Sequence, residues 1–211
     1  LKLDAHESFF IVFSGDKASP ESRSAHDNFP EKRLIKNIGG AWNVSFDPRW
    51  GGPANIQFDS LQDWIVNSNP GIRYYSGTAR YDKDFDMEDY HATAEYILDL
   101  GNVKNIARIK LNGKDLGVVW THPWQKNITN VLKKGQNHLE ITVANLWINR
   151  LIGDAAIPGD GPKNGTWPEW LLKDRKRPGK RYTFVTSEVF TKDSPLSSSG
   201  LLGPVSILEQ L

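Results

Sequence analysis

Acidic side chains are the first candidates for chemistry in this chain. Hydrolysis of a glycosidic bond needs two carboxyl groups at a defined separation, one protonated and one ionised. Eight side chains have suitable chemistry: Asp59, Asp63, Asp82, Asp84, Asp86, Asp99, Asp154 and Glu169. None stands in a recognisable catalytic motif, and Asp82, Asp84 and Asp86 alternate along one face of an expected strand, as solvated residues do. We therefore predict no catalytic residue in this chain.

Nucleophilic and metal chemistry lack a recognisable motif as well. No Gly-x-Ser-x-Gly sequence places a serine at a nucleophile turn. The chain has no cysteine, which excludes a thiol nucleophile, a disulfide and a cysteine zinc site. There is no phosphate-binding loop, dinucleotide fingerprint or EF-hand. These patterns predict no cofactor and no metal ligand.

The segment "WTHPW", residues 120–124, offers aromatic binding chemistry. An exposed ring of Trp120 or Trp124 can stack on a pyranose while His122 fixes a hydroxyl group. The alternative is structural: Trp124 would cap the core beside the rigid Pro123, and His122 would order the loop. We predict ligand binding at Trp120, His122 and Trp124, and both roles stay open.

The segment "NLWINRLIGD", residues 145–154, provides polar side chains in quick succession. Asn149 and Arg150 could bind the hydroxyl groups of a sugar, and we expect them to lie close to "WTHPW" at one end of the fold. The alternative is an internal ion pair between Arg150 and Asp154 that fixes the following loop, because the backbone of a long loop needs internal partners.

The composition is that of an ordinary globular domain. The chain has 211 residues, a net charge of +1 and eight tryptophans. A net charge so close to zero suggests neither a nucleic-acid nor a membrane partner, and no apolar run approaches the roughly 20 residues that cross a bilayer. The tryptophans fit either a sugar-binding surface or an aromatic β core.

The order of patterns predicts one all-β domain. Residues 1–13 are expected to hold the last strand of a preceding domain, "SFFIVF", and 14–35 to form a linker. Residues 36–211 form short strands of period two, with Trp42, Val44 and Phe46 on one face. The sequence between 107 and 120 predicts a hairpin, because Asn112-Gly113 suits a type I′ turn. Short strands at close spacing predict an antiparallel jelly-roll β-sandwich.

Three further segments carry local predictions. Ser60 is expected to cap a helical turn, and residues 128–137 are expected to form a second helical turn closed by Gly135. Residues 181–190 and 201–208 are expected to supply the last strands. Residues 150–181 show little periodicity and predict a long ordered loop, which in a compact domain is usually functional.

The motifs together resemble a known family. The chain has Asn112-Gly113, Gly117, Pro123-Trp124, Ile128-Thr129, Gly135-Gln136-Asn137 and Asn145 in the order found in galactose-binding-like jelly-roll modules. The longer set "PGIRYYSGTARYDKDF", "NLWINRLIGD" and "SGLLGPVSI" resembles the C-terminal portion of α-L-rhamnosidase-type glycoside hydrolases of family 106 and its relatives. The resemblance covers about residues 38–208.

This resemblance implies a function for the chain. In that family the catalytic carboxylates lie on a separate barrel domain, so the chain is expected to be an accessory domain of a larger bacterial enzyme. Its partners would be a carbohydrate, rhamnose-containing or pectic, and the upstream catalytic domain of the same polypeptide. The location would be periplasmic or extracellular, with the signal peptide cut away. Such modules often hold a structural Ca²⁺, for which no ligands can be assigned here.

Three function classes remain open on the sequence alone. The first is a carbohydrate-binding accessory domain, the second a structural domain that docks on the catalytic barrel without touching sugar, and the third an independent enzyme. The basic segment 173–181, with six cations and one acid, is either a solvated loop or an attractor of acidic polysaccharide.

Overall fold

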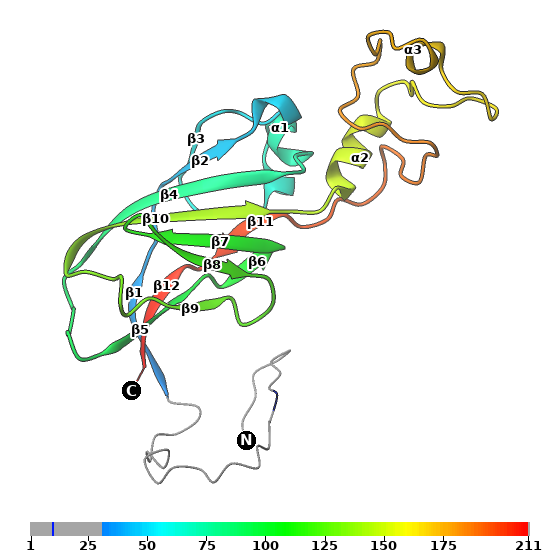
Figure 1. Cartoon of the computed structure of the whole chain (residues 1–211). Coiled ribbons are helices and arrows are strands. Elements are labelled where there is room, and N and C mark those ends of the chain that lie inside the picture. The colour runs from blue at the N-terminus through cyan, green and yellow to red at the C-terminus, as the bar shows by residue number, and fades with distance from the viewer. Residues whose placement is uncertain (1–9, 11–30, 211) are drawn as a thin grey trace.

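The computed structural model describes residue 10 and residues 31–210, so the predicted strand "SFFIVF", apart from Phe10, lies outside the described residues. Two antiparallel sheets form a sandwich (Figure 1). In order across the first sheet, the strands are β1 (Lys32–Asn37), β12 (Ser206–Gln210), β5 (Glu95–Asp99) and β9 (Gln125–Asn127). The all-β antiparallel sandwich predicted from the sequence is confirmed.

The second sheet is the larger one. Its strands, in order, are β3 (Ile56–Phe58), β2 (Trp42–Phe46), β4 (Thr78–Met87), β10 (Gly135–Ala144), β7 (Ile106–Leu111) and β8 (Lys114–Val119). A short pair, β6 (Asn102–Lys104) and β11 (Gly200–Gly203), completes the fold. The strand β1 begins at Lys32, inside the range expected to be linker, because these residues pair with β12.

Alternation of side chains sets the register of the central strands. On β10, Leu139, Ile141 and Val143 are all buried, and they pair with Leu111, Ile109 and Ala107 on β7. A slip by one residue would expose the whole apolar set, so this register is strongly specified. The β7–β8 hairpin turns at Asn112 and Gly113, with φ of 52° and 81°, which confirms the predicted type I′ geometry.

The tryptophans divide between core and surface. Trp42 and Trp64 are fully buried, and the indole of Trp64 donates a hydrogen bond of 2.6 Å to the Tyr81 hydroxyl. Burial raises the pKa of Tyr81, so its hydroxyl stays protonated in the core. Trp50, Trp124 and Trp170 are half-buried, whereas Trp120, Trp147 and Trp167 are exposed. The aromatic core thus accounts for the buried tryptophans, and a sugar-binding surface stays a prediction for the exposed ones.

Several local predictions were wrong. The turn near Ser60 is a 3₁₀ turn, η3 (Trp64–Val66), whose cap is Asp63 instead, because its carboxylate accepts from the Ile65 amide at 3.1 Å. Two more short helical segments, η2 (Pro48–Trp50) and α1 (Pro70–Arg73), were not predicted.

Two further segments also differ from expectation. Residues 128–134 form a hydrogen-bonded turn without a helix, and Gly135 is the first residue of β10. Residues 181–190 form no strand.

Residues 146–198, named the arm here, leave the sandwich after β10 and return before β11. The arm contains two helices, α2 (Ile148–Ala155) and α3 (Glu169–Leu172), where the sequence predicted a loop. Figure 1 shows the arm, yellow to orange, projecting from one end of the sandwich. Gly153 permits α2 to lie against Tyr74, since a Cβ atom there would come within 2.7 Å of that side chain.

Candidate functional site

The predicted corner, residues 120–124, lies at the same end of the sandwich as the start of the arm. It connects β8 of the larger sheet to β9 of the smaller one. Val119 is paired with Ala107, and Ala107 is paired with Val143 near the end of β10. The corner follows β8 and the arm follows β10, so both leave the larger sheet at the same end, with β7 between them. The sequence predicted this shared end. No hydrogen bond of the described chain joins the corner to Asn149 or Arg150.

The side chains of the corner differ in accessibility. Trp120 has 73% of its surface exposed, and His122 is exposed as well. Trp124 packs partly against the core, and its carbonyl oxygen accepts from the Leu100 amide at 2.9 Å. Trp124 therefore has the capping role that was the structural alternative, while Trp120 and His122 are open to solvent.

Asn149 lies inside the arm and has only 1% of its surface exposed. Its amide nitrogen donates to the Ser197 carbonyl at 2.7 Å and to the Ser199 hydroxyl at 2.9 Å. Its amide oxygen accepts from the Ser197 amide at 2.8 Å. The side chain joins the outgoing and returning segments of the arm and has no free face for a sugar.

Arg150 is buried at the base of the arm. Its backbone amide donates to the Ser76 hydroxyl at 3.1 Å, and its Nη2 donates to the Trp50 carbonyl at 2.8 Å. The guanidinium lies 4.5 Å from the centre of the Tyr182 ring and 4.0 Å from Asp154. Burial lowers the pKa of Arg150, and the charge of Asp154 opposes that shift.

Asp154 completes this anchor by accepting from the amide and hydroxyl of Thr183 at 2.7 and 2.8 Å. The structure thus agrees with the alternative in which Arg150 and Asp154 form an internal ion pair and fix the loop that follows. The five residues predicted to bind a ligand do not form one site: three are at the corner, and Asn149 and Arg150 hold the arm. The small residue Ser76, one of the partners, sits in the segment 75–77 that precedes β4.

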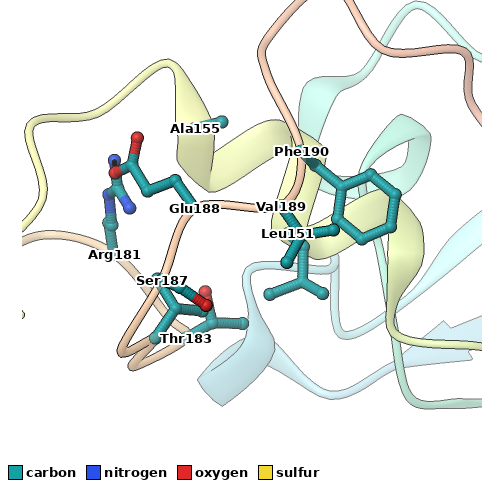
Figure 2. A pocket seen from close by; sticks show the side chains of 9 residues that line it. Leu151, Ala155, Arg181, Thr183, Ser187, Glu188, Val189 and Phe190 are labelled. Atoms are coloured by element: carbon teal, nitrogen blue, oxygen red, sulfur yellow. Dashed lines mark ion pairs between the residues drawn. The ribbon is translucent and has the colours of Figure 1, made fainter.

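A cavity of about 120 Å³ lies between α2 and the returning segment 181–190 (Figure 2). Leu151, Val189 and Phe190 supply apolar lining. Buried Arg181 binds Glu188 at 2.8 Å and the Ile157 carbonyl at 2.6 Å. The only carboxylate that lines the cavity is paired with this arginine, so the cavity offers no acid–base couple.

Apart from Asp59, the other candidate carboxylates have structural partners, and among them Asp86 accepts from the Gln136 side chain and Glu169 pairs with Lys173. Asp63 caps η3 and also accepts from the Ser199 amide at 2.9 Å, and Asp99 accepts from the Gly101 amide at 2.7 Å. Asp82 pairs with Arg80, and Asp84 contacts His138. Within residues 10 and 31–210, no group of three or more His, Asp or Glu side chains could hold a metal ion, so no calcium ligands are assigned.

A groove on the arm escaped prediction. It is lined by Gly159, Asp160, Gly161, Lys163, Thr166, Trp167, Pro168, Trp170 and Pro178. The sequence held two signals for it. Asn164-Gly165 is a preferred turn pair, and the structure forms a tight turn there with φ of 49° and 77°. The second signal was the pair of tryptophans, Trp167 and Trp170, within five residues after Gly165.

The family of the chain follows from the comparison with family models. Residues 63–169, about half of the chain, match the family described as glycosyl hydrolase 2 galactose-binding domain-like. The strands from β4 to β10, with the β7–β8 hairpin, lie within this range. The chain belongs to this family of galactose-binding-like domains.

Individual proteins similar to the chain are much longer than it. A Formosa agariphila protein named "Putative beta-glucuronidase" is 43% identical over 176 residues, which cover 81% of this chain and 15% of that protein. The rhamnosidase of Novosphingobium sp. PP1Y is 33% identical with a TM-score of 0.75, over 92% of this chain and 16% of its own. The β-D-glucuronidase of Dictyoglomus thermophilum is 17% identical with a TM-score of 0.53, over 88% of this chain and 29% of its own, and supports the fold alone. The chain thus spans about a sixth of its two nearer relatives named here.

No helix of the described residues combines the length and the apolar character that a membrane crossing requires.

Proposed function

We propose that the chain is a non-catalytic accessory domain that binds carbohydrate for a larger glycoside hydrolase. Its family is that of galactose-binding-like domains, and its relatives are named as a rhamnosidase and a glucuronidase. Most of its candidate carboxylates are engaged in caps and ion pairs, which supports a non-catalytic role. The substrate class in this proposal is a rhamnose-containing or pectic plant polysaccharide, and the location is the periplasm or the extracellular space.

The observation that carries the proposal is the exposed ring of Trp120. A tryptophan with 73% of its surface in water is unusual for so large an apolar side chain. The corner that bears it is tied to both sheets, since Val119 belongs to β8 and Gln125 begins β9. A ring on a fixed rim suits stacking against the C–H face of a pyranose, and the imidazole of His122 adds a polar group beside it.

The test uses tryptophan fluorescence during titration with rhamnose-containing oligosaccharides. We expect a saturable response in the wild type and a loss of affinity of about fivefold or more in Trp120→Ala, the effect of losing about 1 kcal/mol. Val118→Ala is the control, because it removes a neighbouring exposed apolar side chain on β8. Circular dichroism verifies folding. An unchanged affinity in folded Trp120→Ala would remove the corner from the binding surface.

A second function, docking on the catalytic domain, is favoured by the arm. Eight large apolar side chains of the arm are exposed: Leu146, Trp147, Trp167, Leu171, Leu172, Tyr182, Phe184 and Val189. Surfaces of this kind mark protein interfaces. Hydrogen exchange of residues 167–172 separates the two functions: strong protection in the full-length enzyme relative to the isolated chain supports docking, and equal exchange excludes it.

A further inference from the structure

The groove on the arm has an aromatic wall that is held in place. The ring of Trp167 stacks on Phe184 with centroids 6.4 Å apart and planes 18° apart, and Trp170 meets Phe184 edge-on at 5.7 Å. The indole nitrogen of Trp170 donates to the Asp160 carbonyl at 3.1 Å. Trp167 keeps 46% of its surface exposed. The wall is thus formed before any ligand arrives, which lowers the entropic cost of binding.

The shape of the groove also depends on a backbone turn and on a close contact at a glycine. Lys163 and Thr166 exchange hydrogen bonds of 3.0 and 2.9 Å between their amide and carbonyl groups, which closes the turn at 163–166. Gly179 lies against Asp160, where a Cβ atom would come within 2.1 Å of the carboxylate. A side chain at 179 would therefore displace Asp160, so glycine preserves the shape of the groove.

The charge of Asp160 is neutralised within the groove wall. Arg177 donates to its carboxylate from Nε at 2.5 Å and from Nη2 at 2.8 Å, and the same Nη2 donates to the Thr183 carbonyl. These hydrogen bonds hold the pKa of Asp160 below its usual value. Arg177 therefore has a structural role, and it does not share in the attraction of acidic polysaccharide that the sequence allowed for segment 173–181.

Basic side chains without an ion pair among the described residues occur on the groove and next to it in sequence: Lys163 lines the groove, and Lys176 and Lys180 stand two residues to either side of Pro178, which lines it as well. Residues 156–190 contain seven basic and four acidic side chains, a net charge of +3 in a chain of net charge +1. In segment 173–181, Lys173, Arg177 and Arg181 pair with acids.

Four other cations of the arm are exposed and have no ion pair among the described residues: Lys163, Arg175, Lys176 and Lys180. Asp174 is the one exposed acid of the basic segment. The surplus of free cations favours an anionic ligand.

We propose that this groove binds an acidic pyranoside, a hexuronate residue of a glycan. The ring of Trp167 contacts the C–H face of the sugar, while Lys163 and the exposed cations of segment 173–180 attract its carboxylate. This inference rests on the proposed carbohydrate-binding function and gives it a second surface, separate from the corner at Trp120. Charge complementarity distinguishes this occupant from a neutral sugar.

The experiment measures binding of α-1,4-tetragalacturonate and of its carboxyl-reduced neutral counterpart by calorimetry. Trp167→Ala should weaken binding of the acidic probe about tenfold, as loss of an aromatic anchor does, and Trp167→Phe should restore part of it. The triple variant Arg175→Gln, Lys176→Gln, Lys180→Gln should weaken the acidic probe alone and reduce the dependence of its affinity on salt. The control Lys114→Gln, Lys133→Gln, Lys134→Gln removes three exposed lysines near the β7–β8 turn and should bind as the wild type does.

The outcomes separate this proposal from the proposed function. If folded Trp167→Ala and the arm triple variant both bind tetragalacturonate with wild-type affinity, the proposal that the groove binds a hexuronate is wrong. The wild type could instead bind rhamnose-containing oligosaccharides through Trp120 and fail to bind tetragalacturonate. That result would also contradict hexuronate binding in the groove, and it would leave the carbohydrate-binding function intact. An equal loss of affinity for tetragalacturonate in the arm and control triple variants would show that only net charge matters, and it would refute a local site.

Discussion

A few buried polar residues fix the position of the arm on the sandwich. Asn149, Arg150 and Asp154 lie on the inner face of α2, and their partners come from residues 50, 76, 183 and 197. A buried amide or charge without partners destabilises a protein, whereas a fully bonded one fixes a unique arrangement. Asn149 is fully bonded, whereas Arg150 Nε and Asp154 Oδ1 have no hydrogen-bond partner among the described residues. The side-chain bonds to residues 50, 183 and 197 specify the position of α2 more sharply than apolar contacts alone would.

Replacement of Asn149 tests this role at the residue scale. Asn149→Ala removes three hydrogen bonds and leaves the Ser197 amide without its side-chain partner, while the Ser197 carbonyl keeps the hydrogen bond from the Ser199 hydroxyl. We expect the free energy of unfolding, measured by urea denaturation, to fall by about 1–3 kcal/mol, and amide exchange at 197–199 to accelerate. The matched control, Asn130→Ala, alters an exposed asparagine and should change stability by less than about 0.5 kcal/mol. Equal stability of the two variants would contradict the anchoring role.

At the scale of elements, the strands were predictable and the arm was not. Strands β7 and β10 bury every second residue, and β4 does so except at half-buried Lys83, so their pattern of period two reveals them directly. Helix α2 buries Asn149, Arg150 and Asp154, and its N-cap makes no side-chain hydrogen bond. A helix whose buried face is polar looks like a loop in sequence, because the partners that satisfy it lie far away along the chain.

The register of β7 against β10 gives a prediction at this scale. Leu111 has 1% of its surface exposed and pairs with Leu139 in the larger sheet. Leu111→Ala should lower the free energy of unfolding by about 2–5 kcal/mol, since it removes buried methyl groups and leaves a cavity. Val118→Ala on the neighbouring strand β8 is the exposed control and should change it by less than about 0.5 kcal/mol. A small effect of Leu111→Ala, seen in the thermal midpoint or in urea, would mean that the register is different.

The candidate site was predictable in part, for a reason that concerns the whole molecule. The corner at 120–124 was placed at the correct end of the sandwich, because hairpin and strand patterns fix which loops share an edge. Its separation from Asn149 and Arg150 was not predictable, since exposure depends on how the arm folds back. The arm groove brings together residues 159–170 and 178 through the pair of Asp160 and Arg177, which no local pattern encodes.

The whole molecule also carries a prediction about catalysis. We expect the isolated chain to hydrolyse neither an aryl α-L-rhamnoside nor an aryl β-glucuronide, the classes for which its relatives are named. A glycosidase needs one protonated and one ionised carboxyl group about 5–10 Å apart at an open site. Here Asp63 and Asp99 hold turns, Asp154 is buried against Thr183, and Asp160 is bound by Arg177. Release of nitrophenol from each substrate is the measurement, with a full-length rhamnosidase and glucuronidase as positive controls. Turnover by the pure chain that disappears when one Asp or Glu is replaced would show that the catalytic pair resides in this domain after all.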